Sequence, residues 1–397
     1  DTLETARNRY QVSKVAAQPG VYRKISGNEA IVYGLVVASK KANRELLYSG
    51  YPITPASPVL EGLSQLKKYG VKCVQAEDEI AAMGVALGAS FAGDLSVCAT
   101  SGPGMCLKSE FIGLASITEL PLIICNVQRG GPSTGLPTKT EQSDLLQALF
   151  SRHGDCPLPV LAAHSPSDCF DCAMDAVRIA LTYMTPVVLL SDLYVANGSE
   201  PWRVPNIVDL PEIENSFASE DEEYVIYRRD PETLARTQAI PGQVGLEHRI
   251  GGLEKGEDGG VSYDPDNHEE MTRLRAEKVA VISKSFKPLD IRGESEGDLL
   301  VIGWGGTYGA ISSAVGNLIE EGFSVSSVHL RHLNPLPDDL GEVMGRFKKV
   351  IVPELNLGQL ALILRAQYLT DIISYGKVQG KPFKVSELTE KFLEHLN

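Results

Sequence analysis

The sequence predicts an α/β protein that contains two parallel sheets, one in each of two domains. Short apolar runs alternate with longer amphipathic runs from about residue 27 to 205, and the same alternation returns from about residue 296. The apolar runs are apolar at nearly every position, which is typical of strands that helices cover on both faces of a sheet. Between the two regions, residues 206–295 are acidic, rich in Pro and Gly, and without clear periodicity. We therefore expect two α/β domains joined by an irregular connector.

The first alternating region predicts a domain over residues 27–205. Its runs predict helices over 28–42, 58–69, 78–93, 105–120 and 168–184, and strands over 45–50, 71–75, 95–100, 121–127, 158–163 and 186–192. A helix follows every strand but the fourth before the next strand begins, and strands joined in this way pair in parallel. A long polar loop follows the fourth strand.

The rest of the chain predicts a second, smaller domain and two flanking segments. The connector ends in a helix predicted over 268–286. The second domain, 296–397, is predicted from strands over 298–305, 324–331 and 348–354 and from helices over 307–322, 338–347 and 357–370. Residues 1–26 are predicted to be a tether ahead of the first domain. Because residue 1 is not Met, we expect a further segment upstream of it.

Charge and cysteine usage narrow the class of protein. The chain has 37 Lys and Arg against 51 Asp and Glu, a formal net charge of −14, without a run of basic residues. Such a surface repels phosphate backbones and anionic lipids, so we expect neither nucleic acid nor a membrane as a partner. No apolar run reaches the ~18 residues that suggest a membrane-spanning helix. Seven cysteines, an odd number, are typical of reduced thiols, and we expect a cytoplasmic protein.

Cys169 and Cys172 form a C-x-x-C pair that has two interpretations. The spacing is typical of redox and metal sites. The pair also lies on a predicted amphipathic helix, and the chain has no second pair that would complete a zinc site. We favour two small packing residues on the buried face of that helix.

Candidate functional residues follow the strands of the first domain. In an open parallel sheet, ligands bind beyond the carboxyl ends of the strands. Four loops follow such ends, with the sequences YPITPAS (51–57), AEDE (76–79), SGPG (101–104) and QRGGPSTGLPTKTEQSD (128–144). They belong to neighbouring elements of one domain, so we expect them to converge.

The loop over 128–144 is the richest of the four. Arg129 directly follows an apolar strand, and a guanidinium group can bind a carboxylate through two parallel hydrogen bonds. Further donors in the loop are Ser133, Thr134, Thr138 and Lys139. The alternative is a solvated loop with one structural arginine, but long loops inside compact domains are usually functional. A phosphate-binding loop is excluded, because Leu136 stands where that motif needs Lys.

Two other loops supply one candidate each. Thr54 lies between Pro52 and Pro55, whose fixed φ angles make a stiff turn from strand to helix that can hold the threonine hydroxyl rigidly. Glu79 ends the acidic run 77–79 at the start of a predicted helix. Acidic residues in this position often only complement the helix dipole, and the residues alone leave that alternative open.

In this order, the motifs YPITPAS, QAEDEIAA, ATSGPG and NVQRGGPSTGLPTKTEQSD resemble those of the α subunits of 2-oxoacid:ferredoxin oxidoreductases, most closely the 2-oxoglutarate type. The resemblance extends over nearly the whole chain, through GLEHRIGG, YDPDNHEEMTRLRAEK and VPELNLGQL. It implies a pyrimidine-type thiamine-diphosphate-binding domain at 27–205 and a transketolase C-terminal-like domain at 296–397. It also implies interconversion of 2-oxoglutarate and coenzyme A with succinyl-CoA and carbon dioxide, with electrons exchanged with ferredoxin through iron–sulfur clusters.

The resemblance implies roles for residues of this sequence. Glu79 matches the catalytic glutamate that hydrogen-bonds the aminopyrimidine ring of thiamine diphosphate. Thr54 and Arg129 match residues that hold the carboxylate of the 2-oxoacid, and Thr54 is also expected beside the cofactor. Thr134 and Thr138 match further positions of the substrate pocket. Our own addition is Lys139, as a second cation for the distal carboxylate of 2-oxoglutarate.

Half of the implied cofactor site has no counterpart in the sequence. The G-D-G and Asn-Asn motif that binds magnesium and the diphosphate is absent, and so are cysteines spaced for a cluster. The resemblance therefore implies a β subunit that brings Mg²⁺, the diphosphate contacts and a [4Fe–4S] cluster, so that the two subunits share the cofactor. It also implies a γ domain, often fused ahead of the α chain.

Three alternatives stay open. The chain can serve an enzyme that uses pyruvate or a broad range of 2-oxoacids, with the same mechanism. It can be a non-catalytic assembly subunit of such a complex. A transketolase-like enzyme is the third alternative, and it needs the diphosphate half of the site on a partner without clusters.

Overall fold

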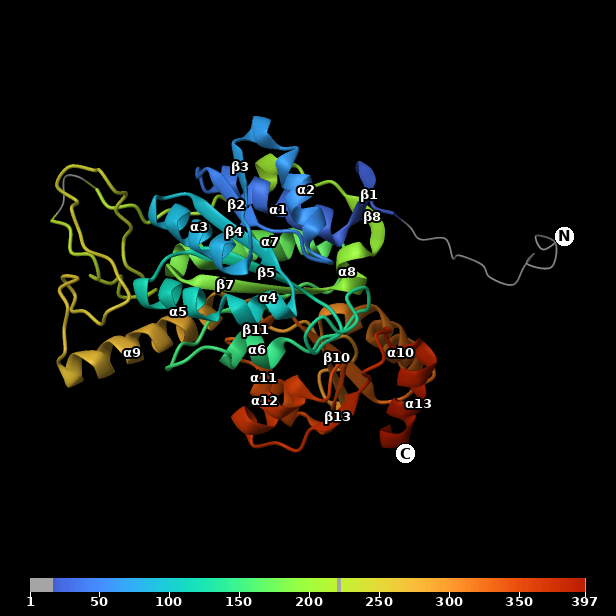
Figure 1. Cartoon of the computed structure of the whole chain (residues 1–397). Helices are drawn as coiled ribbons and strands as arrows, with labels where there is room; N and C mark the ends of the chain where they lie inside the picture. The colour runs from blue at the N-terminus through green and yellow to red at the C-terminus, as the bar shows by residue number, and fades with distance from the viewer. Residues whose placement is uncertain (1–16, 220–222, 397) are drawn as a thin grey trace.

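The computed structural model describes residues 17–219 and 223–396 (Figure 1). Its larger sheet has seven strands in the order β11-β6-β7-β5-β4-β2-β3. The strands β2 to β7 pair in parallel, and β11 pairs antiparallel with β6 at one edge. Their bounds are β2 (Leu46–Gly50), β3 (Val71–Gln75), β4 (Leu95–Thr100), β5 (Leu122–Gln128), β6 (Val160–Ala162), β7 (Pro186–Asp192) and β11 (His332–Asn334). All six strands predicted for the first region are confirmed.

Helices cover both faces of this sheet. They are α1 (Gly27–Lys41), α2 (Ser57–Ser64), α3 (Glu79–Phe91), α4 (Gly102–Leu107), α5 (Ser109–Thr118), α6 (Leu145–Phe150), α7 (Asp168–Tyr183) and α8 (Leu193–Asn197), and the short α6 and α8 are additions to the predicted set. Residues of α1 and α7 share a core with Ile123 and Cys125 of β5, whereas α3, α4 and α5 share the other core with Leu122 and Ile124. Alternate residues of one strand thus enter two cores, which explains the continuous apolar runs.

The helix predicted over 105–120 is wrong in its extent, because the structure has two helices there. α4 begins at Gly102, so most of the SGPG motif lies inside a helix instead of ahead of it. Pro103 occupies the first turn of α4, where its missing N–H costs no hydrogen bond. α5 follows, and its C-cap residue, Glu119, has a φ of 52° that turns the chain out of the helix.

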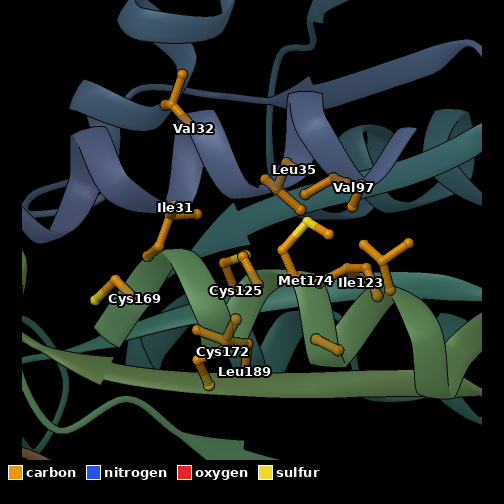
Figure 2. Packing of buried hydrophobic residues seen from close by; sticks show 14 of the residues in the cluster. Ile31, Val32, Leu35, Val97, Ile123, Cys125, Cys169, Cys172, Met174 and Leu189 are labelled. Atoms are coloured by element: carbon orange, nitrogen blue, oxygen red, sulfur yellow. The ribbon is translucent and has the colours of Figure 1, made fainter. Parts of the chain in front are cut away.

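Cys169 and Cys172 are packing residues, as predicted. Both lie on α7 with no exposed surface. Figure 2 shows them among apolar side chains of α1, β5 and β7 such as Ile31, Cys125 and Leu189. Neither forms a disulfide, and burial raises the pKa of both thiols, which disfavours the reactive thiolate.

The second sheet has four parallel strands in the order β10-β9-β12-β13. Its elements are β9 (Gly297–Trp304), β10 (Val325–Leu330), β12 (Phe347–Glu354), β13 (Ile373–Gly376), α10 (Tyr308–Glu320), α11 (Leu340–Gly345), α12 (Gln359–Tyr368) and α13 (Val385–Leu396), of which β13 and α13 are additions to the predicted set. One apolar core extends from the larger sheet to this one and includes Leu190 and Trp304. The boundaries between the domains stay a prediction.

The connector over 206–295 is largely irregular and forms the yellow loops at one side of Figure 1. Its regular parts are a 3₁₀ turn (Ile207–Asp209), α9 (Pro265–Ala280) and a 3₁₀ helix (Val281–Ser285), so the helix predicted over 268–286 is α9 continued by a tighter turn. Ahead of it, β1 (Tyr22–Ser26) pairs antiparallel with β8 (Ser199–Arg203). Of the tether predicted over 1–26, residues 1–16 lie outside the described residues. No helix in the described parts of the chain has the length and apolar character needed to cross a bilayer.

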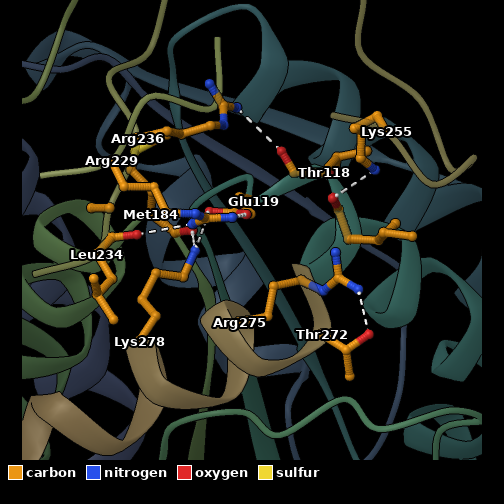
Figure 3. Close-up of polar contacts among 12 residues, drawn as sticks. Thr118, Glu119, Met184, Arg229, Leu234, Arg236, Lys255, Thr272, Arg275 and Lys278 are labelled. Carbon is orange, nitrogen blue, oxygen red and sulfur yellow. Dashed lines mark hydrogen bonds and ion pairs between the residues drawn. The ribbon is translucent and has the colours of Figure 1, made fainter. Parts of the chain in front are cut away.

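A buried ion cluster fastens the connector to the first domain (Figure 3). The carboxylate of Glu119, fully buried at the end of α5, accepts hydrogen bonds from both Nη atoms of Arg229, at 2.8 and 2.5 Å. Lys278 of α9 donates to the same carboxylate and, at 3.0 Å, to the carbonyl of Met184. Burial alone would raise the pKa of Glu119, but the charges of Lys278 and Arg229 outweigh it and lower that pKa to about 2.

Candidate functional site

The four candidate loops open at one edge of the larger sheet. They follow β2, β3, β4 and β5, and these strands are neighbours and parallel. Because the carboxyl ends of parallel strands lie at the same edge, the loops that follow them lie close together. The predicted convergence of the loops is confirmed. Whether the candidate side chains form one site depends on where each of them lies.

Glu79 is the first residue of α3 and is half-buried. The residue before it, Asp78, is the N-cap, and its side chain accepts a hydrogen bond from the N–H of Ala81 at 2.8 Å. Of the acidic residues 77–79, Asp78 therefore caps α3, and the carboxylate of Glu79 is not needed for that purpose. Lys108, which is fully buried, donates from Nζ to the main-chain carbonyl of Glu79 at 3.0 Å and so fixes the first turn of α3.

Gly104 of α4 allows close packing against Glu79. A Cβ atom at this position would lie 2.1 Å from the hydroxyl oxygens of both Tyr51 and Thr100, and 3.0 Å from Cγ of Glu79. The two hydroxyl groups hydrogen-bond each other at 2.8 Å. Since any side chain at this position would push α4 away, the SGPG motif supplies the glycine that the packing requires.

Arg129 and Thr54 are in direct contact. Nη1 of Arg129 donates to the main-chain carbonyl oxygen of Thr54 at 2.6 Å. The arginine is 8% exposed, and its buried Nε has no hydrogen-bond partner among the described residues. A buried N–H without an acceptor is unfavourable by about 1–3 kcal/mol, so this guanidinium group is suited to receive one more acceptor. Thr54 is exposed, which leaves its hydroxyl group accessible.

Arg129 lines a cavity of about 730 Å³. Residues of α4, of the loop after β5 and of the C-terminal region around Asn356 form its walls. Its charged residues are Arg129, Glu141 and Asp144, of which the two acids are 5% and 9% exposed. Neither acid was predicted as a site residue, because its residue type alone does not distinguish it from other polar residues of the loop.

Asp144 has a perturbed carboxyl group. Burial raises its pKa to about 6, although Nδ2 of Asn126 donates a hydrogen bond to Oδ2 at 3.0 Å. The nearby charge of Glu141 raises the same pKa further, and that of Arg129 lowers it. A titratable group with such a pKa in a cavity is a candidate functional residue.

Thr134, Thr138 and Lys139 lie outside this cavity. Main-chain hydrogen bonds between Gly130 and Leu136, and between Leu136 and Lys139, close the loop that carries them. All three side chains are exposed, and none lines the cavity around Arg129. The structure thus brings Thr54 to Arg129 and leaves these three on the surface of the same loop, where their predicted roles stay predictions.

Thiamine diphosphate fits the residues of this chain only in part. The carboxyl group of Glu79, which packs against Gly104, can hydrogen-bond a ring nitrogen of the pyrimidine. The diphosphate end needs a divalent cation held by several ligands. Across residues 17–219 and 223–396, no group of three or more His, Cys, Asp or Glu side chains could hold a metal ion.

The sequence is similar to known oxidoreductases. The family model described as "Pyruvate flavodoxin/ferredoxin oxidoreductase, thiamine diP-bdg" matches residues 38–261. The 2-oxoglutarate oxidoreductase subunit KorA of Mycobacterium tuberculosis is 52% identical over 390 residues, which cover 98% of this chain and 59% of that protein. The 2-oxoglutarate synthase subunit KorA of Archaeoglobus fulgidus is 37% identical over 341 residues, 85% of this chain and 88% of that protein. The chain thus spans somewhat more than half of the first relative and most of the second.

The fold is similar to that of solved structures. A 2-oxoglutarate:ferredoxin oxidoreductase from Magnetococcus marinus, with 2-oxoglutarate, coenzyme A and succinyl-CoA bound, is 36% identical and superimposes with a TM-score of 0.92, over 100% of this chain and 69% of that one. A split-gene transketolase is 13% identical with a TM-score of 0.54, over 94% of this chain and 98% of that one, and shows a common fold. The predicted α/β fold class, with a thiamine-diphosphate-binding domain, is confirmed.

Proposed function

The chain belongs to the pyruvate flavodoxin/ferredoxin oxidoreductase family, and we propose that it is the α subunit of a 2-oxoglutarate:ferredoxin oxidoreductase. Such an enzyme interconverts 2-oxoglutarate and coenzyme A with succinyl-CoA and carbon dioxide, and exchanges electrons with ferredoxin. The observation that carries the proposal is Arg129, which lines the cavity at the sheet edge, contacts Thr54, and has a buried Nε without a hydrogen-bond partner among the described residues. The relatives named 2-oxoglutarate oxidoreductase or synthase support the choice of substrate.

In this proposal, residues of the chain bind and orient the substrate and one end of the cofactor. Thiamine diphosphate, when bound, supplies the carbon nucleophile and the electron sink that decarboxylation requires. Glu79 holds the aminopyrimidine ring through a charge-assisted hydrogen bond. Arg129 binds the carboxylate of the 2-oxoacid, and the Thr54 hydroxyl adds a second donor to it. Lys139 binds the distal carboxylate from the surface of the loop, and Thr134 and Thr138 are further residues of the substrate pocket.

The proposal requires a partner. A β subunit brings Mg²⁺, the diphosphate contacts and a [4Fe–4S] cluster, and passes electrons to ferredoxin. The described residues support this division, because they offer a site for the pyrimidine end and no metal site. All seven cysteines of the chain are free thiols, which supports a cytoplasmic location.

The test is an assay of the chain together with its β subunit, under anaerobic conditions, with thiamine diphosphate, Mg²⁺ and coenzyme A. Carbon dioxide release and ferredoxin reduction are measured with 2-oxoglutarate, pyruvate and 2-oxobutyrate. We expect kcat/KM to be highest for 2-oxoglutarate. A higher value for pyruvate, or similar values for all three, would establish the alternative substrates instead. Visible absorbance of the complex distinguishes it from a transketolase-like enzyme, which has no clusters.

A further inference from the structure

Asp144 occupies the N-cap position of α6 without capping it. Aspartate is a preferred N-cap residue because its carboxylate accepts hydrogen bonds from the first N–H groups of a helix. The side chain of Asp144 makes no such bond. The N–H of Leu146 instead donates to Oε1 of Gln359 at 3.0 Å, and Nε2 of Gln359 donates to the carbonyl of Ser143 at 2.7 Å. Gln359, from the C-terminal region, thus caps the N-terminus of α6, the role that an aspartate at position 144 would normally have.

Asp144 lines the same cavity as Arg129. Its Oδ2 accepts a hydrogen bond from Nδ2 of Asn126, a fully buried residue of β5. Its Oδ1 accepts no hydrogen bond within the part of the chain that the structure describes. Gly102 makes room for it, since a Cβ there would lie 3.0 Å from each carboxyl oxygen.

The charges of the cavity show why the protonation state of Asp144 matters. Oε2 of Glu141 accepts hydrogen bonds from the N–H of Gly131 at 3.3 Å and from the hydroxyl of Ser143 at 3.0 Å. Glu141 offsets the charge of Arg129. An ionised Asp144 would then give the cavity a net negative charge and repel an anionic substrate.

The groups around Asp144 come from three parts of the chain. Arg129 directly follows β5, Glu141 lies in the loop after that strand, and Cys106 of α4 also lines the cavity. The C-terminal wall offers only uncharged side chains, including Asn356 and Gln359. The surroundings of Asp144 thus contain one cation and one carboxylate, and the burial of Asp144 raises its pKa.

We propose that Asp144 is a further substrate-binding residue, whose neutral carboxyl group donates a hydrogen bond from Oδ1 to the 2-oxoacid that Arg129 holds. The bond from Asn126 to Oδ2 directs the proton to Oδ1, the oxygen without a partner. A neutral acid at this position adds a donor for the substrate and removes the repulsion, as in other sites that keep a carboxylic acid protonated. The inference rests on the proposed function and extends it with a residue that makes substrate binding depend on pH.

The test uses the complex with the β subunit and two variants of Asp144. In Asp144→Asn the amide can accept from Asn126 and donate to the substrate at every pH, whereas Asp144→Ala has no donor. The dissociation constant of 2-oxoglutarate is measured by calorimetry without coenzyme A, and KM by turnover, from pH 5.5 to 8. For the unmodified protein we expect the affinity to fall about tenfold per pH unit well above the pKa. The Asp144→Asn complex should bind 2-oxoglutarate tightly at every pH in this range. The Asp144→Ala complex should bind it at least about tenfold more weakly than the Asp144→Asn complex at every pH.

A control variant and a measurement of folding make the outcome decisive. Glu141→Gln removes the other cavity carboxylate, and we expect the affinity to keep the same slope with pH, with its midpoint at a lower pH because the charge of Glu141 raises the pKa of Asp144. Thermal unfolding of each complex shows whether a variant has folded. The inference is overturned if Asp144→Asn retains the pH dependence, or if Asp144→Asn and Asp144→Ala bind 2-oxoglutarate equally. Failure of the proposed function has a different result: the unmodified complex releases no carbon dioxide from any 2-oxoacid.

Discussion

Arg129 hydrogen-bonds the main chain of Thr54 and not its hydroxyl group, through Nη1 and the carbonyl oxygen at 2.6 Å. The contact therefore depends on the position of the backbone, which the turn after β2 sets. The side chain of Thr54 takes no part in it. For this reason the hydroxyl group can be removed by mutation without loss of the arginine contact.

We expect Thr54→Ala to reduce kcat/KM for 2-oxoglutarate by roughly tenfold to a hundredfold, the value of about one hydrogen bond to a charged group. Thr54→Ser keeps a hydroxyl group and should retain most of the activity. Stability and association with the β subunit should be unchanged in both variants, because Thr54 is exposed. Steady-state kinetics and thermal unfolding check this, and a Thr54→Ala enzyme with normal kcat/KM would remove Thr54 from the site.

Glu79→Gln should lower kcat by about a hundredfold or more, because an amide can donate a hydrogen bond to the ring nitrogen of the aminopyrimidine but cannot transfer a proton to it. Glu77→Gln is the matched control, since Glu77 is an exposed acid two residues away, ahead of the N-cap. We expect that control to turn over normally. Turnover of the reconstituted complex and calorimetric binding of thiamine diphosphate are the measurements. An unimpaired Glu79→Gln complex would support the assembly-subunit alternative.

Lys139→Ala should weaken the use of 2-oxoglutarate far more than that of pyruvate, which has no second carboxylate. The side chain of Lys139 is exposed and lies beside Gly380, since a Cβ built on Gly380 would lie 2.8 Å from the Cβ of Lys139. Lys381→Ala removes a neighbouring exposed cation and serves as the control. We expect KM for 2-oxoglutarate to rise about tenfold only in the first variant. Equal effects on both substrates would exclude Lys139 as the partner of the distal carboxylate.

Local periodicity was enough to predict most of the strands and helices, and long-range contacts decided the rest. β11 is three residues long and exists because it pairs with β6, a contact that no local pattern reveals. α13 lies beyond the last predicted helix, and its Leu388 and Phe392 pack in an apolar core with Leu299 of β9. The split between α4 and α5 was missed because the apolar pattern continues through both.

A site residue could be predicted from the sequence where its type is unusual for its position, such as a charged residue directly after an apolar strand. A single Arg after an apolar strand stood out, and its contact with Thr54 follows from the neighbouring strand ends. Glu141 and Asp144 were missed because their burial depends on the C-terminal region, where Gln359 replaces the expected cap of α6. The exposure of Lys139 likewise depends on how its loop closes on itself.

Glu119→Gln should destabilise the chain by about 3–5 kcal/mol, because it leaves Arg229 and Lys278 buried without their carboxylate. The pH dependence has a definite sign. The pKa of Glu119 is lowered from 4.5 to about 2 in the folded chain, so its contribution to stability is present above about pH 4.5 and is lost as the pH falls towards 2. Unfolding in urea, followed by near-ultraviolet circular dichroism between pH 3 and 7, measures both effects. Glu212→Gln, which removes an exposed partner of Lys41, should cost less than about 1 kcal/mol. If the two variants were equally stable, the buried cluster would not anchor the connector.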